Sequence, residues 1–514
     1  MLNKLGSLSG VFAQKNMHPL IDEREFKRIL NELPKDNAFK ALDEIAGWLE
    51  SLLAADDCPA DRAYEVARQL EDAAQGHLKR LARNYLNTPR MPRADEKRLW
   101  SINFGFWTLL SAAYKRCLLV LGDKSKAAEQ LKSALPALCT RFIAAQGAVL
   151  KWEQFHYGPA SGDIWRQMGY ALLIAEEAGV ATKAVPYGAL GGLSSPLQAH
   201  QKAMVFQAAS LDSLLPHEIQ LAEQLIEHFL PSFVFTREAS SDSVYWVDLS
   251  LAQAPLRLAK MPQSSQPGQR FFKPGGAHAE ISALLNLLEQ GGDIPPEINL
   301  GDHYFPKTLI PVLRHLATYL APIPPQRKHD RHHVKNRMSV LNGLINAFVV
   351  FSEEFGGRPA GLQMESWVVE NVSRGGFGAV LGNVPAEWLK VGALLAMQPG
   401  GGDNWLLGII RRYHRLSDSE VRVGIESLSR QTLSVDLKPR TASSYAAVAG
   451  TPALLILDGN LPGEVRVVLP MASFDLHESM EYTQGGQRQL LTPVALLEQT
   501  TDFELARYRL SVIG

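Results

Sequence analysis

Cysteine is scarce in this chain of 514 residues: there are three, Cys58, Cys117 and Cys139, and no CxxC pair. An odd number of widely spaced cysteines excludes a disulfide framework and argues against a zinc knuckle. We expect all three to be buried in a reducing compartment, as free cysteines usually are. The chain also lacks a secretory leader pattern and any uninterrupted apolar run of about 18 residues, so we predict no membrane insertion and a cytoplasmic location.

Neither sign of charge is in excess, because 52 lysines and arginines face 53 aspartates and glutamates. A balanced chain has no global attraction for nucleic acid, so nucleic acid is not expected as a partner and any anion site must be a local patch. Hydrophobic residues make up 46% of the chain, which is enough for more than one buried core. Since no GxSxG, HExxH or paired-carboxylate motif occurs in a supporting context, we expect neither an enzyme nor a cofactor.

Residues 1–230 predict an all-α helical domain. Apolar residues recur at helical spacing, as where Phe39, Leu42 and Ile45 share one face. No repeat period of roughly 34 or 40 residues holds over three units, so a regular helical repeat is not expected. Residues 231–320 mix strand-like and helix-like patterns and are predicted to form a connecting region.

Strand-like segments follow one another after residue 320, among them LINAFVVF, ESWVVENVS, GFGAVLG, EVRVGIESLS and TLSVDLK. Short strands between Gly and Asn or Asp turns are typical of a small antiparallel barrel. Residues 321–438 are predicted to form this barrel behind a basic, proline-rich linker. Residues 439–514, with a hairpin turn expected at Gln484–Gln487, either complete it or form a second barrel. The predicted fold class is multidomain α+β, an N-terminal all-α helical domain with a C-terminal antiparallel β-barrel and extra β-strands.

Two polar motifs carry the chemistry of the C-terminal part. Arg327 and Arg331 in the linker RKHDR present two planar guanidinium groups, which suit phosphate and the acceptor edge of guanine. Asn371, Ser373 and Gly376 in NVSRGG, between two expected strands, offer an amide, a hydroxyl and accessible backbone N–H groups. Together the motifs predict a surface pocket for an anionic purine ligand.

This combination resembles the PilZ family of bacterial cyclic di-GMP receptors, which carry an RxxxR motif before the barrel and a D/N-x-S-x-x-G motif within it. The resemblance covers residues 326–438 and implies a PilZ-like barrel. It further implies that both arginines clamp the phosphates and guanines of cyclic di-GMP, and that Asn371, Ser373 and Gly376 complete the contacts. About 40 residues separate Arg331 from Asn371, more than is usual for the family, so an insertion is expected around residues 352–361.

Secondary ligand contacts are expected from Gln326, Lys328, Arg374 and Gly375. We predict that residues 322–336 are mobile without ligand, because this stretch is polar and broken by proline. On binding, the stretch would fold over the nucleotide and reorient the helical domain, which would relay the signal to an unidentified protein partner.

Other interpretations of the same residues stay open. His329, Asp330, His332 and His333 could suggest a metal site, but adjacent histidines on an extended segment point in opposite directions and no cysteine completes the set, so no metal is expected. One alternative function is a PilZ-like scaffold that no longer binds nucleotide and acts through protein contacts. The other is a single-stranded nucleic-acid binder, which needs aromatic platforms, and the barrel offers few beyond Trp367, Phe377 and Trp405.

Overall fold

The computed structural model of the chain describes residues 18–87, 91–121, 126–158, 161–187, 192–260, 262, 264–300, 304–326, 330–352, 362–382, 388–402, 404–417, 419–440 and 450–513. These residues divide into two compact units. The helical unit comprises Met1–His156, Ala160–Leu211 and Pro216–Pro325. The barrel unit comprises Gln326–Gly514 and two short segments, Tyr157–Pro159 and Asp212–Leu215. The predicted multidomain α+β fold class is confirmed.

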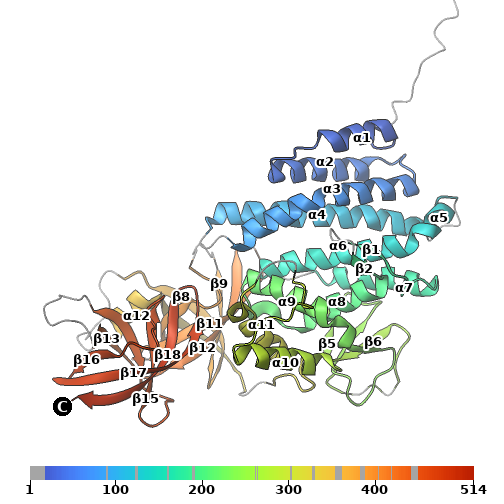
Figure 1. Ribbon diagram of the computed structural model, residues 1–514. Helices are drawn as coiled ribbons and strands as arrows, with labels where there is room; N and C mark the ends of the chain where they lie inside the picture. The colour runs from blue at the N-terminus through green and yellow to red at the C-terminus, as the bar shows by residue number, and fades with distance from the viewer. Residues whose placement is uncertain are drawn as a thin grey trace, which may run out of the picture. The chain divides into compact units, whose positions relative to one another are not determined.

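Helices build most of the helical unit, and the first four are stacked on one another (Figure 1). Several begin at a capping residue: the side chains of Asp22, Asn37 and Ser195 accept hydrogen bonds from backbone N–H groups in the first turns that follow. The helices are α1 (Glu23–Glu32), α2 (Ala38–Ala54), α3 (Ala60–Asn87), α4 (Arg93–Val120), α5 (Lys126–Leu131), α6 (Leu135–Phe155), α7 (Asp163–Glu177), α8 (Pro196–Ala208), α9 (Pro216–Phe229), α10 (Ala277–Glu289) and α11 (Pro306–Tyr319), with short 3-10 turns η1 (Lys132–Ala134), η2 (Leu211–Ser213) and η3 (Leu230–Ser232).

Helix α6 packs against α4, α7 and α8 and is buried over much of its surface. Of the residues described, one helical stretch, Glu129–Phe155, is long and apolar enough to cross a membrane, and 67% of its most apolar window is buried within the structure. The core helix of a packed bundle has the same composition. Near the start of α6, Arg141 donates to the buried carboxylate of Glu71 at 2.5 Å, and Tyr114 of α4 donates to the same carboxylate.

Residues 231–320, which the sequence treats as a separate connecting region, lie in the helical unit. They contribute α10, α11 and a four-stranded sheet in the order β3-β6-β4-β5. Its aromatic residues Phe235, Tyr245 and Phe272 stack on one another. The strands of this unit are β1 (Val185–Tyr187), β2 (Gly192–Ser194), β3 (Val234–Thr236), β4 (Tyr245–Asp248), β5 (Leu256–Arg257) and β6 (Gln269–Lys273).

Two closed antiparallel barrels of six strands each form the barrel unit. The first follows the order β10-β11-β12-β9-β8-β7 and the second the order β13-β14-β15-β18-β17-β16. The TLSVDLK segment is therefore the first strand of the second barrel, and all the later strands belong to the same barrel. The first barrel consists of β7 (His332–Asn342), β8 (Glu365–Ser373), β9 (Gly376–Gly382), β10 (Leu394–Pro399), β11 (Leu406–Arg415) and β12 (Glu420–Ser429), and the second of β13 (Thr432–Pro439), β14 (Thr451–Ile456), β15 (Glu464–Pro470), β16 (Met480–Gln484), β17 (Gln487–Gln499) and β18 (Phe503–Ile513).

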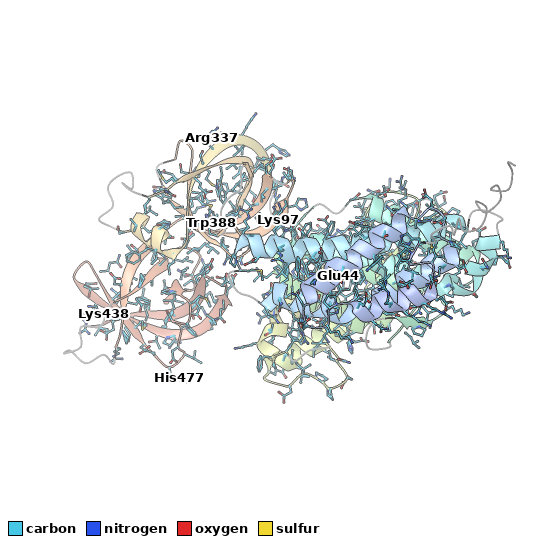
Figure 2. The ribbon with its side chains drawn as sticks, turned by 90° about the horizontal axis from the view of Figure 1, so that it is seen from above. Glu44, Lys97, Arg337, Trp388, Lys438 and His477 are labelled. Atoms are coloured by element: carbon cyan, nitrogen blue, oxygen red, sulfur yellow. The ribbon has the colours of Figure 1, made fainter. Side chains whose placement is uncertain are left out.

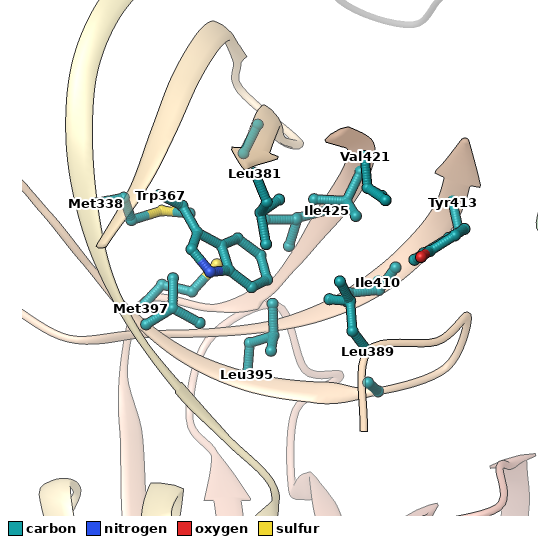
Figure 3. Packing of buried hydrophobic residues seen from close by; sticks show 14 of the residues in the cluster. Met338, Trp367, Leu381, Leu389, Leu395, Met397, Ile410, Tyr413, Val421 and Ile425 are labelled. Carbon is teal, nitrogen blue, oxygen red and sulfur yellow. The ribbon is translucent and has the colours of Figure 1, made fainter. Parts of the chain in front are cut away.

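Each barrel encloses its own apolar core. In the first, Met338, Trp367 and Ile425 point inward from different strands (Figure 3), and the Trp367 ring stacks on that of Trp388 at 6.0 Å. Arg337 and Trp388 belong to this barrel, whereas Lys438 and His477 belong to the second (Figure 2). The second core is made of Leu437, Leu455, Val467, Leu491, Tyr508 and neighbouring apolar residues.

A third apolar cluster joins the two barrels. Leu407 and Ile409 on the outer surface of β11 pack with Ile456 and Phe503 of the second barrel and with helix α12 (Leu344–Val350). Helix α12 corrects the sequence prediction, which assigned LINAFVVF to a strand. Ala347 and Val350 of this helix are buried in the cluster. Their spacing of three residues places both side chains on one face of the helix, and that face packs against the junction. Helix α12 also lies within the long interval before Asn371, whereas most of the predicted insertion, residues 353–361, lies outside the described part of the chain.

Candidate ligand-binding site

A β-bulge in β8 turns Asn371 and Ser373 to the outer face of the first barrel. Val369 lies in the barrel core, but the register shifts directly after it, and Asn371 pairs with Gly378. Gly378 is an outer-face position, because its two neighbours in β9 face the core. The extra residue Glu370 therefore reverses the alternation of the strand. With an unbroken alternation, both motif side chains would point into the barrel with Val369.

Two glycines of β9, Gly376 and Gly378, lie beside these side chains on the outer face. A Cβ atom at Gly376 would lie 1.9 Å from the carbonyl oxygen of Ile425, so the close approach of β12 requires glycine there regardless of any ligand. At Gly378 a Cβ would lie 2.5 Å from the amide nitrogen of Asn371, which means that the amide lies over this glycine. The hydroxyl of Ser373 donates to the carbonyl oxygen of Gly376 at 3.3 Å.

The chain enters the barrel next to this surface. Arg331 is exposed and immediately precedes β7, where His332 pairs with Val372 and His333 pairs with Asn371. The structure thus brings the backbone of Arg331 to the end of β8 that carries the motif. The last part of the stretch that we predict to be mobile, residues 332–336, belongs to strand β7.

Two of the predicted contacts, Arg327 and Lys328, lie outside the described residues. Gln326 is exposed and belongs to no helix or strand. Arg374 and Gly375, both exposed, form the two-residue turn between β8 and β9, since Ser373 pairs with Gly376. The structure therefore places the described part of the barrel motif on one turn and its two flanking strand ends.

A hollow of about 280 Å³ adjoins the β8–β9 turn. The guanidinium of Arg430 donates to the carbonyl oxygen of Arg374 at 3.4 Å and helps to hold the turn. Burial acts to raise the pKa of Asp458, but hydrogen bonds from the Ser429 hydroxyl and the backbone N–H of Arg430 outweigh it and hold that pKa below its ordinary value. Two guanidinium groups and one carboxylate thus make the lining weakly positive. The hollow is lined by Arg374, Ser427, Leu428, Ser429, Arg430 and Asp458.

The pairing register continues the site across the barrel. Asn371 pairs with Gly378, Gly378 with Gly424, and Gly424 with Arg412 of β11. Neither Gly378, Gly424 nor Arg412 was singled out from the sequence. The signal was present in GFGAVLG and EVRVGIESLS, because a glycine inside a strand marks a bulge or a close approach to the backbone. Which strands would align these glycines depends on the register, which the sequence does not show.

Metal and aromatic sites receive little support from the described residues. Among them, no group of three or more His, Cys, Asp or Glu side chains is placed to hold a metal ion, while His329 lies outside that part of the chain. Trp367 is only 2% exposed, Phe377 packs against the first core, and Trp405 packs against the junction cluster. These rings therefore do not form the open stacking platforms that single-stranded nucleic acid needs.

Comparison with known families adds a result for the helical part. Residues 24–240 match the family model described as the N-terminal domain of the cyclic-di-GMP receptor FimW. This match spans α1 to α9 and ends in the loop after β3, so it covers less than half of the chain and none of the residues around Asn371. No curated protein matches the chain.

Proposed function

We propose that this protein is a receptor for cyclic di-GMP and that it binds the nucleotide on the outer face of the first barrel, around Asn371 and Ser373. Two separate parts of the chain support the same ligand. The helical part matches the N-terminal domain of a cyclic-di-GMP receptor. The barrel part carries the PilZ-like motif, and the bulge at Glu370 turns the partly exposed Asn371 and Ser373 to the outer face, which is the observation that carries the proposal.

The chemistry of the surface suits a doubly charged purine dinucleotide. Cyclic di-GMP has two phosphodiester charges and two guanines. The Asn371 amide can both donate to and accept from a guanine edge, and Ser373 adds a hydroxyl. Arg331 supplies a guanidinium beside the same strand end, and Arg327 would supply a second from the preceding segment. Gly378 and Gly424 have no Cβ, so a ring or a phosphate can approach the backbone closely where the flexible Asn371 and Arg412 side chains give way.

In this proposal Arg327, Arg331, Asn371 and Ser373 make the main contacts. Lys328, Arg374 and Gly375 lie in or next to these motifs and add secondary contacts, as does Gln326 at the start of the linker. Gly376 completes these contacts through its backbone, and its lack of a side chain also lets β9 and β12 approach each other, which shapes the turn.

The proposed role is that of a receptor and not an enzyme, with no cofactor besides the nucleotide as ligand. The helical unit would present the response to a protein partner. A cytoplasmic location fits the three cysteines, all of which are buried as free thiols. Binding of single-stranded nucleic acid is disfavoured because Trp367 and Phe377 pack in the barrel interior.

Calorimetric titration of the full chain with cyclic di-GMP tests the proposal, with linear pGpG and cyclic di-AMP as comparison ligands. We expect saturable binding of cyclic di-GMP only, weakened by at least about tenfold in Arg331→Ala and abolished in Arg327→Ala/Arg331→Ala, since each charge-assisted contact contributes about 1.5 to 3 kcal/mol. Arg488→Ala is the matched control, because Arg488 is an exposed arginine of the second barrel. A wild-type chain that stays unoccupied at saturating cyclic di-GMP would contradict the proposal and favour the scaffold alternative.

A further inference from the structure

A row of outer-face positions connects the proposed nucleotide site to β11. Starting from the Asn371 amide, the row passes over Gly378 and Gly424 and ends at Arg412. Three inter-strand steps of about 4.8 Å separate its ends, and the two positions between them carry no side chain. A ligand lying on this glycine floor would therefore meet Asn371 on one side and Arg412 on the other.

The side chain of Arg412 already extends over the floor. A Cβ atom built on Gly424 would lie 3.3 Å from Cβ, 3.7 Å from Cγ and 3.8 Å from Cδ of Arg412, so the stem of the arginine covers this glycine. The side chain is 46% exposed. Its guanidinium is thus within reach of both the glycine floor and the solvent above it.

The guanidinium of Arg412 is paired with a carboxylate from a different part of the chain. Its Nη1 atom lies 3.4 Å from Oδ2 of Asp212, in the barrel-unit segment Asp212–Leu215 that directly precedes α9. The Asp212 side chain is 31% exposed. Burial raises the pKa of its carboxyl, and Arg412 is the strongest of the groups that oppose this rise. Without the guanidinium, Asp212 would be a half-buried carboxylate that has lost its main cation.

Further contacts tie the same segment to the end of β11. Tyr157 donates from its hydroxyl to the carbonyl oxygen of Leu214 at 2.8 Å. Its own carbonyl oxygen accepts from the backbone N–H of Arg415 at 2.7 Å, and its ring packs on Tyr413 with centroids 5.2 Å apart. Two segments that lie far apart in the sequence thus meet at β11. One follows α6 in the chain, and the other directly precedes α9.

We propose that Arg412 is a further ligand-contacting residue of the nucleotide site and that Asp212 competes with the nucleotide for its guanidinium. This inference rests on the proposed function. A phosphate of cyclic di-GMP bound over Gly378 and Gly424 would draw Arg412 from Asp212, since a charge-assisted bond to phosphate matches one to carboxylate. The carboxylate would then move toward water to regain solvation. That movement would loosen residues 212–215 and pass the binding event to α9, which begins at the next residue, Pro216.

Three variants of the full chain, titrated with cyclic di-GMP, separate the parts of this inference. Arg412→Ala should bind at least about tenfold more weakly than the wild type. Asp212→Asn should bind several-fold more tightly, because the competitor is removed. The double variant should bind like Arg412→Ala alone, since Asp212 acts only through the arginine. Asp163→Asn is the matched control: Asp163 is 37% exposed, is also paired with an arginine, and belongs to the helical unit.

Hydrogen exchange provides a second readout that a purely structural pair would not change. Saturating cyclic di-GMP should speed amide exchange in residues 212–215 of the wild type and have no such effect in Arg412→Ala. Tight wild-type binding with unchanged affinity in both Arg412→Ala and Asp212→Asn would overturn this inference and leave the proposed function intact. Weaker binding in Arg412→Ala with no gain in Asp212→Asn would overturn the competition. A wild-type chain that does not bind overturns both proposals.

Discussion

The two barrels have the same strand number and closure, yet differ in where glycine occurs. The strands of the first carry Gly376, Gly378, Gly382, Gly408 and Gly424, whereas the strands of the second carry none. Glycine weakens a strand because it has no side chain to pack and because its backbone loses the most conformational entropy on folding. Gly376, Gly378 and Gly424 lie on the outer face beside the PilZ-like motif, so the first barrel gives up strand stability there, whereas Gly408 faces the interior, where a Cβ would meet Met397.

The difference in glycine content suggests that the two barrels, although similar in fold, contribute differently to the molecule. Both barrels fill their interiors with apolar side chains, and the second also supplies Ile456, Val468 and Phe503 to the junction. The second barrel thus supports the first from one side while the glycine floor occupies another part of its surface. We expect a barrel with glycine-rich strands to gain stability from a neighbour packed against it.

The largest expected effect comes from breaking this support. Phe503 of β18 is fully buried in the junction cluster, and Phe503→Ala should lower the free energy of unfolding of the barrel unit by about 3 to 5 kcal/mol, because it leaves a cavity between the barrels. Urea unfolding followed by tryptophan fluorescence measures the loss. Val512→Ala on the same strand is the control, since Val512 is 63% exposed and should change stability by less than about 0.5 kcal/mol. Equal losses in both variants would mean that the junction does not support the barrels.

A smaller loss is expected from adding one carbon to the first barrel. Gly376→Ala should lower its stability by about 2 to 3 kcal/mol, because the new Cβ would collide with the Ile425 carbonyl and force β9 away from β12. Thermal unfolding compares this variant with Gly382→Ala on the same strand, where a Cβ meets nothing within 4 Å. If the two variants had the same melting temperature, the close contact between β9 and β12 would not matter for stability.

Binding should be more sensitive than folding at the centre of the floor. Gly378→Ala places a Cβ against the flexible Asn371 amide and not against backbone, so the amide can swing away at little cost in stability. We expect cyclic di-GMP affinity to fall about tenfold, which corresponds to about 1.4 kcal/mol. Calorimetry of Gly378→Ala beside Gly382→Ala checks this, and equal affinities would show that the floor is not part of the site.

The weakest effect concerns the polar link between the barrels. Arg411 of β11 donates two hydrogen bonds to Glu498 of β17, at 2.5 and 2.8 Å, and both side chains are partly exposed. Glu498→Gln should cost about 1 kcal/mol or less, since Arg411 also pairs with Glu426 and solvent screens the pair. The loss should shrink at high salt, as measured by urea unfolding in low and high ionic strength. A loss as large as that of Phe503→Ala would mean that charge, and not apolar packing, joins the barrels.

Local patterns predicted much of this molecule correctly. The described residues up to 230 are predominantly helical, as predicted, apart from the short strands β1 and β2, and the hairpin at Gln484–Gln487 forms with Gly485 and Gly486 at positive φ. These features depend on residues close together in the sequence. LINAFVVF misled the prediction because short apolar runs are ambiguous between strand and helix, and packing at the junction decided in favour of α12.

By itself, the amino-acid sequence determined the composition of the two motifs, the order of helical and strand-rich parts, and the turn between β8 and β9. Only the tertiary structure decided which way Asn371 and Ser373 face, because the bulge at Glu370 is defined by pairing with β9. The tertiary structure also aligned Gly378, Gly424 and Arg412, and set Asp212 beside that arginine across about 200 residues of chain. The physical reason is that side-chain direction in a sheet follows register, and register is fixed by long-range hydrogen bonds and core packing.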